Sequence, residues 1–165
     1  MCQQPGESLS ALVLWGTNWR ANQKEVPLRE EAARQGLEGF FATSGCYATV
    51  ETRRLPNEAS AVTSTDQELL SVASAANPRP SRLLVVTVRE LGPVVRVFSS
   101  AALVEGGTEV VLELRVLDVG SGASLASFQT HWQNGGAMVI KGVSSLPQDM
   151  RAALREALQP RPLTK

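Results

Sequence analysis

Few side chains in this sequence are of the types that perform covalent chemistry. The chain has one histidine, His131, and two cysteines, Cys2 and Cys46. A catalytic triad needs an imidazole beside a nucleophile and a carboxylate, and a structural zinc site needs four ligands at defined spacing. No such arrangement surrounds His131. We therefore expect a protein that is not an enzyme, with no catalytic residue, no metal site and no cofactor.

Two Gly-Gly pairs are the only stretches that could be mistaken for phosphate-binding loops. They lie in the sequences EGGT and NGGA. Neither has the GxxxxGK pattern between a strand and a helix, so neither is expected to bind a nucleotide. We predict instead that Gly106-Gly107 forms a tight hairpin turn, because both residues tolerate positive φ angles. Asn134-Gly135-Gly136 is predicted to end the strand before it.

Cys2 is followed by the polar stretch QQPGES. Bacterial lipoproteins are cut directly before a cysteine that then carries the lipid, and a flexible polar tether usually follows. If Met1 replaces a removed signal peptide, Cys2 is predicted to be a lipid anchor at a membrane. Gln3 in place of an aspartate favours the periplasmic face of the outer membrane. The alternative is an accidental cysteine in a disordered start. The two cysteines could form one pair at most. If Cys2 is the anchor, Cys46 has no partner and is interpreted as a small, partly buried hydrophobe.

Tryptophans are the best candidates for contacts with a partner or a membrane interface. Trp15 lies in an apolar run and is predicted to be in the core. Trp19 and Trp132 stand beside polar residues near turns, and exposed indoles dominate many interfaces. Arg20 extends the contact of Trp19, and His131 is predicted to be a partly solvated neighbour on the opposite face from Trp132. The alternative for both exposed tryptophans is half-buried packing.

The spacing of apolar residues predicts the elements of the first half of the chain that must position these side chains. Residues 11–15 form a short buried strand. A helix follows over 26–41, weakened by Gly36 and Gly39 unless a neighbour approaches it closely. Residues 46–55 alternate as a second strand. Thr65 to Glu68 has the form of a capping box that starts a helix reaching Ala76.

The second half of the chain reads as a strand meander closed by a helix. Residues 83–88 are apolar on both faces, which indicates a central strand. The run 94–104 leads into the predicted hairpin turn, and two further strands cover 110–117 and 123–132. A capping box beginning at Ser145, with proline in the first turn, predicts a helix that continues to Leu158.

These elements predict one α+β domain with the order β-α-β-α-β-β-β-α and helices packed on a mostly antiparallel sheet. We expect residues 1–9 to be a flexible tether, residues 10–159 to form the domain, and residues 160–165 to be a frayed tail. The hydrophobic content of 43% is enough for one core. Sixteen basic and sixteen acidic residues balance, which argues against nucleic acid as a partner. No apolar run reaches the roughly 20 residues that cross a bilayer.

The sequence resembles the small envelope domains typified by the TolB amino-terminal domain, the curli-secretion lipoprotein and the Pel polysaccharide-export lipoprotein. The resemblance lies in the stretches RLLVVTVREL, EGGTEVVLELRVLD, PQDMRAALREAL and CQQPGES. It implies a non-enzymatic outer-membrane lipoprotein that acts as a scaffold in an export or assembly complex. Its partners would be envelope proteins, copies of itself, and the membrane. The alternative is a regulatory binding module that docks on a periplasmic synthase or transporter.

Overall fold

The computed structural model describes residues 2, 7–56, 62–98, 103–137 and 142–159. Within them the predicted order β-α-β-α-β-β-β-α is confirmed, as is the α+β class. The elements are β1 (Ser10–Thr17), α1 (Val26–Thr43), β2 (Thr49–Arg54), α3 (Asp66–Ser74), β3 (Arg82–Phe98), β4 (Leu103–Asp118), β5 (Ser124–Ala137), the short 3-10 helix η1 (Val143–Ser145) and α4 (Leu146–Leu158).

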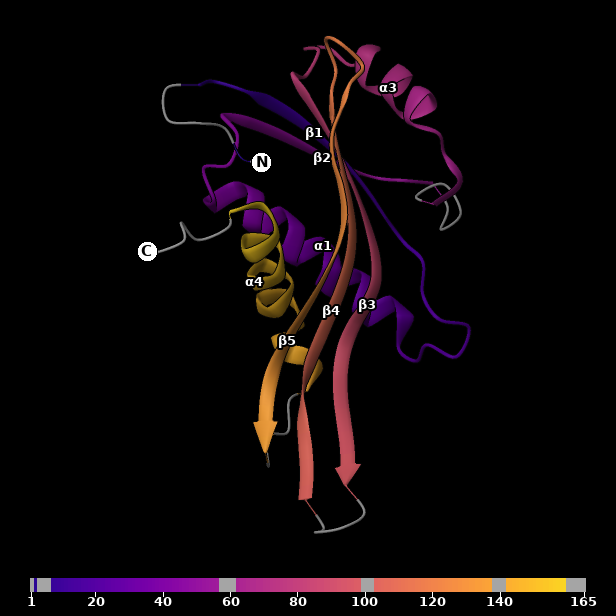
Figure 1. The fold of residues 1–165 in the computed structure, drawn as a ribbon, viewed down its shortest axis with the longest axis vertical. Helices are drawn as coiled ribbons and strands as arrows, with labels where there is room; N and C mark the ends of the chain where they lie inside the picture. Colours follow the sequence, from indigo (N-terminus) through magenta and orange to yellow (C-terminus); the bar gives the residue numbers. More distant parts are fainter. Residues whose placement is uncertain (1, 3–6, 57–61, 99–102, 138–141, 160–165) are drawn as a thin grey trace.

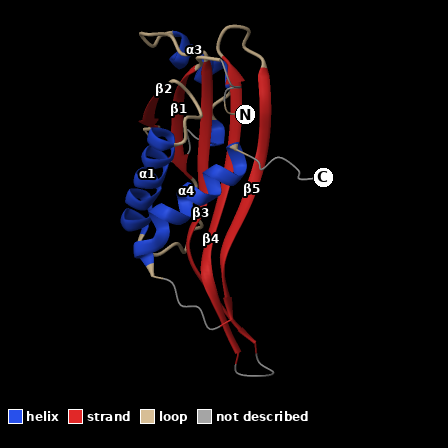
Figure 2. Ribbon diagram, turned by 90° about the vertical axis from the view of Figure 1, so that its left-hand side faces the viewer, coloured by secondary structure: helices blue, strands red, loops and turns tan. Residues whose placement is uncertain are grey.

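The strands form one mixed sheet in the order β2-β1-β3-β4-β5. β1 pairs in parallel with both β2 and β3, while the longer β3–β4 and β4–β5 ladders are antiparallel. Helices α1 and α4 cover one face of the sheet, here called the helix side, and α3 lies against one end of the other face, the outer side (Figures 1 and 2). The β3–β4 hairpin extends past the helices at its far end (Figure 1).

The main core lies between the sheet and the pair of helices α1 and α4. Trp15, Met150 and Leu154 are buried there, as the apolar spacing predicts. The two helices cross closely at Gly36, where a side chain would meet Met150. This close approach explains why α1 carries a glycine that its intrinsic helix propensity disfavours.

A smaller core lies on the outer side, under α3. Leu69 and Ala73 of this helix pack on β1 and β3 residues such as Leu12 and Val85. The predicted capping box is confirmed, because Thr65 Oγ1 accepts from the Glu68 backbone N–H and the Glu68 carboxylate accepts from the Thr65 N–H. The prediction of the same motif at Ser145 is wrong. The Ser145 side chain does not cap α4, because it donates to a carboxylate oxygen of Asp149 at 2.9 Å.

Both predictions for the Gly-Gly pairs are wrong. Gly106-Gly107 lies inside β4, and Gly135-Gly136 lies inside β5, where the two pairs face each other across the ladder. A Cβ on Gly107 would lie 2.5 Å from the Asn134 carbonyl oxygen, so the missing side chains let the two backbones approach closely. The β3–β4 ladder continues past these glycines to the pair Phe98 and Leu103.

Several predictions fall partly or wholly outside the described residues. These are most of the tether before residue 7 and the tail 160–165. In the part of the chain that the structure does describe, every helix is too short or too polar to cross a membrane.

Candidate interaction site

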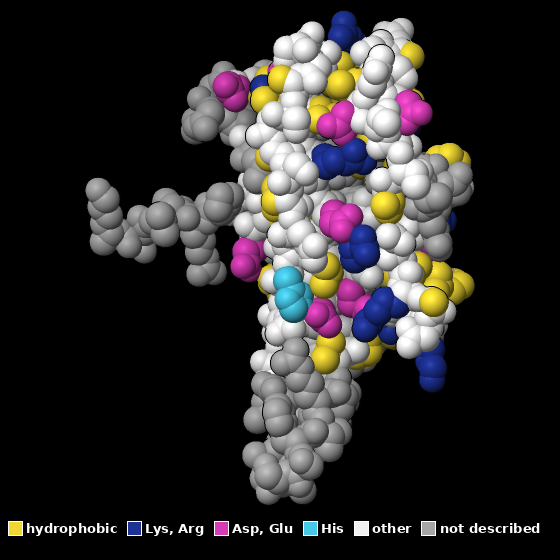
Figure 3. Space-filling model, turned by 45° about the vertical axis from the view of Figure 1, so that its right-hand side comes forward, with side chains coloured by type: hydrophobic (Ala, Val, Ile, Leu, Met, Phe, Trp, Pro, Cys, Tyr) yellow, Lys and Arg dark blue, Asp and Glu magenta, His cyan; other side chains and the backbone are white. Residues whose placement is uncertain are grey.

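The outer side of the sheet is open beyond α3 and carries most of the functional candidates. A shallow groove of about 350 Å³ lies there, lined by Asn18, Trp19, Arg20, Arg89, Glu90, Glu109, Val111, Glu113 and Gln129. We call this the polar groove. Its residues come from the loop after β1 and from β3, β4 and β5. Acidic and basic side chains lie next to one another on this face, with His131 beside them (Figure 3).

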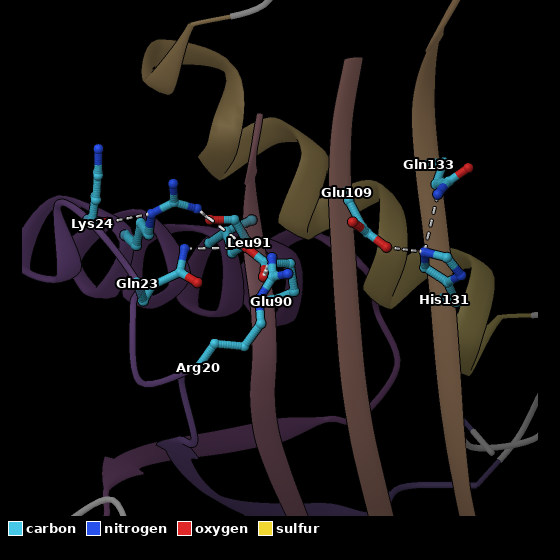
Figure 4. A network of polar contacts seen from close by, with 9 residues as sticks. Arg20, Gln23, Lys24, Glu90, Leu91, Glu109, His131 and Gln133 are labelled. Atoms are coloured by element: carbon cyan, nitrogen blue, oxygen red, sulfur yellow. Dashed lines mark hydrogen bonds and ion pairs between the residues drawn. The ribbon is translucent and has the colours of Figure 1, made fainter. Parts of the chain in front are cut away.

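Glu90 is the most heavily engaged carboxylate of the polar groove. Its side chain is only 9% exposed, and it pairs with Arg20 and with Arg29 of α1. Arg29 Nη1 donates to Glu90 Oε1 at 3.3 Å, and Gln23 Nε2 donates to the same oxygen at 3.2 Å (Figure 4). A buried carboxylate needs such donors, because an unpaired charge away from water is costly.

The Arg29 side chain lies beside the part of β3 that β1 does not reach. β1 pairs with β3 only as far as Val88, so among the described residues no strand lies beside this edge of β3 beyond that point. Arg29 Nη1 donates to the Leu91 carbonyl at 2.5 Å, while its Nε donates to the Lys24 carbonyl at 2.8 Å. Glycine at position 92 makes this possible, because a Cβ there would overlap Nη1. The guanidinium thus satisfies one backbone carbonyl of this edge, that of Leu91.

A second polar contact lies on β4 and β5, at the margin of the groove. His131 Nε2 pairs with a carboxylate oxygen of Glu109, and Gln133 Nε2 lies 3.1 Å from the same imidazole nitrogen (Figure 4). His131 is exposed, as expected, and points to the opposite face from Trp132. Farther along β4, Arg89 Nη1 donates to Glu113 Oε1 at 2.9 Å. The carboxylates of the groove therefore face cationic or imidazole partners.

The structure brings three of the predicted contact residues to this one face and leaves the fourth elsewhere. Trp19 and Arg20 line the polar groove, and His131 borders it through Glu109. Trp132 instead packs against the main core on the helix side. Trp19 is half-buried too, and within the described residues its Nε1 has no hydrogen-bond partner. Half-buried packing, the alternative considered for both tryptophans, describes them better than full exposure.

Sequence reasoning missed the acidic and basic residues that build the groove. Arg89 and Glu90 directly follow the mostly apolar run Leu83 to Val88 within β3. Because charges inside a two-sided strand must find partners, this change to charged residues was the available signal. Nothing in the sequence near Arg29 indicates its role, because the Glu90 carboxylate and the Leu91 carbonyl that it contacts lie on β3, more than sixty residues away.

Cys2 is not the free end of a tether in this structure. It forms a disulfide with Cys46, with the two Cα atoms 4.5 Å apart, and packs against the main core near the end of α4. Cys46 is buried, as expected, but it has the partner that the anchor hypothesis denies it. A sulfur in a disulfide cannot also carry a thioether-linked lipid. Disulfide formation and lipidation of Cys2 exclude each other.

The contacts of the polar groove are ion pairs and hydrogen bonds between neighbouring side chains. A nucleophile activated by a neighbouring base, as in hydrolases, does not occur among the contacts described above. Among the described residues, no cluster of three or more His, Cys, Asp or Glu side chains is placed to hold a metal ion. A shallow face of mixed, mutually neutralised charge is typical of the polar part of a protein–protein interface.

Comparisons with known proteins show which fold this is. No protein-family model matches the sequence, and no curated protein sequence matches it. Among solved structures, a PelC dodecamer from Paraburkholderia phytofirmans is 20% identical, with a TM-score of 0.50 over 93% of this chain and 90% of that one. A neuraminyllactose-binding hemagglutinin homologue from Helicobacter pylori is 12% identical, with a TM-score of 0.50 over 99% and 88%.

A lipoprotein from Neisseria meningitidis is 16% identical, with a TM-score of 0.46 over 92% of this chain and 99% of that one. At these identities the likeness extends to the fold alone. The two structures with TM-scores of 0.50 show that the chain has a PelC-like fold, in agreement with the fold that the resemblance implies.

Proposed function

We propose that this chain is a non-enzymatic component of a bacterial cell envelope that associates with copies of itself and holds an export or assembly complex in place. The observation that carries the proposal is the PelC-like fold, because the PelC neighbour is a dodecamer. This is an argument by analogy of fold, so it needs support from the residues of the chain itself.

The residues support a binding role in two ways. The open face of the sheet carries paired charges rather than an activated nucleophile or base. The chain as a whole is neutral, with sixteen basic and sixteen acidic residues, so copies do not repel one another through net charge. Both features suit a protein whose task is to contact other proteins.

Membrane attachment through Cys2, at the periplasmic face of the outer membrane, is the second part of the proposal. It requires a state in which Cys2 is not paired with Cys46. Two or three acyl chains on Cys2 would then hold the domain at the bilayer, because each buried CH₂ contributes about 0.8 kcal/mol. Copies confined to one plane would meet at high effective concentration, which favours self-association.

The test is to express the chain from Cys2 onward behind a lipoprotein signal peptide, which is cut directly before the cysteine, in a Gram-negative bacterium with labelled palmitate. We expect the wild-type protein to be labelled and recovered with outer membranes, and the Cys2→Ser variant to be neither. The intact mass identifies chains in which Cys2 is paired with Cys46, because a disulfide lowers the mass by two hydrogen atoms. An unlabelled wild type that carries the disulfide would contradict the anchor.

The half-exposed indole of Trp19 favours one further candidate, a regulatory module that docks on a periplasmic synthase or transporter. Trp19 and Arg20 sit side by side on the polar groove, where a partner would reach both. Crosslinking in cells followed by affinity purification tests this role. Recovery of one specific enzyme, lost with Trp19→Ala, would support it, whereas recovery of self-copies alone would count against it.

A further inference from the structure

The sheet ends in two edges of very different character. One edge is β2, with six residues, and the other is β5, with fourteen. β5 lies at the margin of the sheet, beyond β4 (Figure 2). Each backbone group that points outward from such an edge lacks a ladder partner, so an exposed edge strand is a template for pairing with another chain.

The edge at β2 is guarded against pairing, and the edge at β5 is not. β2 carries Glu51, Arg53 and Arg54 within six residues. Natural sheets protect their edges with charged side chains, proline and short length. The β5 sequence, SLASFQTHWQNGGA, contains no Asp, Glu, Lys, Arg or Pro. Its neighbour β4, which is not an edge, carries five charged residues over a similar length.

The helix side of β5 is also incompletely covered. Phe128 and Trp132 pack against the main core but stay half-exposed, because the helices reach only part of this strand. Aromatic side chains of this size bury a large apolar area when a partner covers them. Within the part of the chain that the structure describes, no strand pairs with the outer edge of β5, and the two half-exposed rings lie on this same strand.

We propose that β5 pairs antiparallel with β5 of a second copy across a two-fold axis at Thr130, which makes one continuous sheet of the two domains. This inference rests on the proposed self-association and names the surface that carries it. A two-fold axis perpendicular to the sheet keeps the helix sides of both copies on one face, so equivalent elements meet.

The position of the axis follows from the sequence of β5. With Thr130 on the axis, Phe128 of each copy lies directly opposite Trp132 of the other copy on the helix side. On the outer side, Gln129 faces His131, which brings no like charges together. This register also pairs Ser124 with Gly136, so nearly the whole strand takes part. Aromatic cross-strand pairs are among the more stabilising neighbours in antiparallel sheets.

Pairing of β5 with β2 of another copy is less favourable. Since β5 runs in the same direction as β2 within the sheet, a head-to-tail arrangement would pair the two strands in parallel. The β5–β2 ladder would contain six residues of each strand, whereas the β5–β5 ladder contains thirteen. Pairing with β2 would also place the uncharged β5 strand beside Glu51 and Arg53. Parallel ladders are also slightly less stable per residue than antiparallel ladders.

A symmetric cysteine crosslink tests the register. In the full chain with Cys2→Ser and Cys46→Ser, Thr130→Cys places one thiol on the axis, where the Cα atoms of a cross-strand pair lie about 4.5–5.5 Å apart, within disulfide range. Thr52→Cys is the matched control, because Thr52 is a half-buried threonine of the other edge strand. Circular dichroism confirms that each variant is folded.

We expect mild oxidation to convert most of Thr130→Cys to a dimer, with at least a tenfold smaller yield from Thr52→Cys. Hydrogen exchange of the wild-type chain should show β5 amides becoming more protected as concentration rises. A wild type that self-associates in light scattering while Thr130→Cys gives no more dimer than the control would overturn the β5 interface and leave the proposed self-association standing. A wild type that is monomeric at every concentration, on membranes as in solution, would overturn both.

Discussion

Gly92 leaves room for the Arg29 side chain because it has no Cβ. Its Cα faces the Arg29 guanidinium so closely that a Cβ would overlap Nη1. Gly92→Ala should therefore expel Arg29 from the edge of β3, remove its bonds to Leu91 and Lys24, and leave Glu90 with fewer donors. Breaking a buried ion pair in this way costs about 3 kcal/mol.

Urea unfolding at pH 7 measures this effect against a matched control. Gly142→Ala meets nothing within 4 Å among the described residues and has no positive φ angle, so its free energy of unfolding should stay within about 0.5 kcal/mol of the wild type. Equal stability of the two variants would show that Arg29 is not held as described.

Glu31 gives the surface of α1 a pH-dependent contribution. Hydrogen bonds from the Arg34 guanidinium and the Gln35 amide lower the pKa of Glu31 from 4.5 to about 2. Because the folded-state pKa lies below the unfolded value, the stabilisation is complete above pH 4.5 and is lost as the pH falls toward 2. The contribution is modest, since the groups are exposed and solvent screens them.

Glu31→Gln should therefore flatten the dependence of unfolding free energy on pH between 4.5 and 2. Urea titrations at several pH values in this window give the slope for both proteins. Glu156→Gln removes an exposed carboxylate of α4 without touching the Arg34 cluster and serves as the comparison. If Glu31→Gln keeps the full wild-type slope, the interaction with Arg34 does not survive in solution.

At the scale of elements, the two glycines of α1 should respond to alanine in opposite directions. A Cβ on Gly36 would lie 2.5 Å from Cβ and Cγ of Met150 in the crossing with α4. This overlap should outweigh the gain in helix propensity of about 1 kcal/mol and leave a net loss of about 1–2 kcal/mol. At Gly39 the obstacle is the flexible, exposed end of Arg151, which can move away.

We therefore expect Gly39→Ala to stabilise the protein by about 0.5–1 kcal/mol, while Gly36→Ala destabilises it. Thermal and urea unfolding of the two variants compare them directly. Adding Met150→Ala to Gly36→Ala tests the cause, because it should recover part of the loss in the double-mutant cycle. Two variants of equal stability would mean that α1 and α4 do not cross at Gly36.

The order of elements could be predicted from the sequence because periodicity, caps and helix breakers are local signals. Thr65 and Glu68, for example, lie three residues apart and satisfy each other within one turn. A Gly-Gly pair is ambiguous, because the same missing side chains suit a tight turn and a close crossing of strands. Which one occurs at Gly106-Gly107 depends on Gly135-Gly136, nearly thirty residues away.

The candidate site was less predictable for the same reason. Trp19, Arg20 and His131 were identified as individual side chains, and the structure brings them to one face. The partners that decide their role, Glu90 and Glu109, come from other strands. The pairing of Cys2 with Cys46 joins segments 44 residues apart, and no local pattern specifies it.

At the scale of the whole molecule, the Cys2–Cys46 disulfide fastens the start of the chain to the segment between α1 and β2. The free energy of unfolding of the purified chain should then fall by about 2–4 kcal/mol on reduction, because the crosslink restricts the unfolded chain. The double variant Cys2→Ser/Cys46→Ser should match the reduced wild type and show no response to reductant.

Urea unfolding of protein recovered from membranes and from the soluble fraction, each with and without dithiothreitol, separates the two states of Cys2. A lipidated chain has no disulfide to lose, so its stability should be the same in both conditions. The soluble chain should lose stability when reduced. A membrane fraction that responds to reductant as the soluble fraction does would mean that Cys2 is paired there, and that something other than a thioether-linked lipid holds the protein at the membrane.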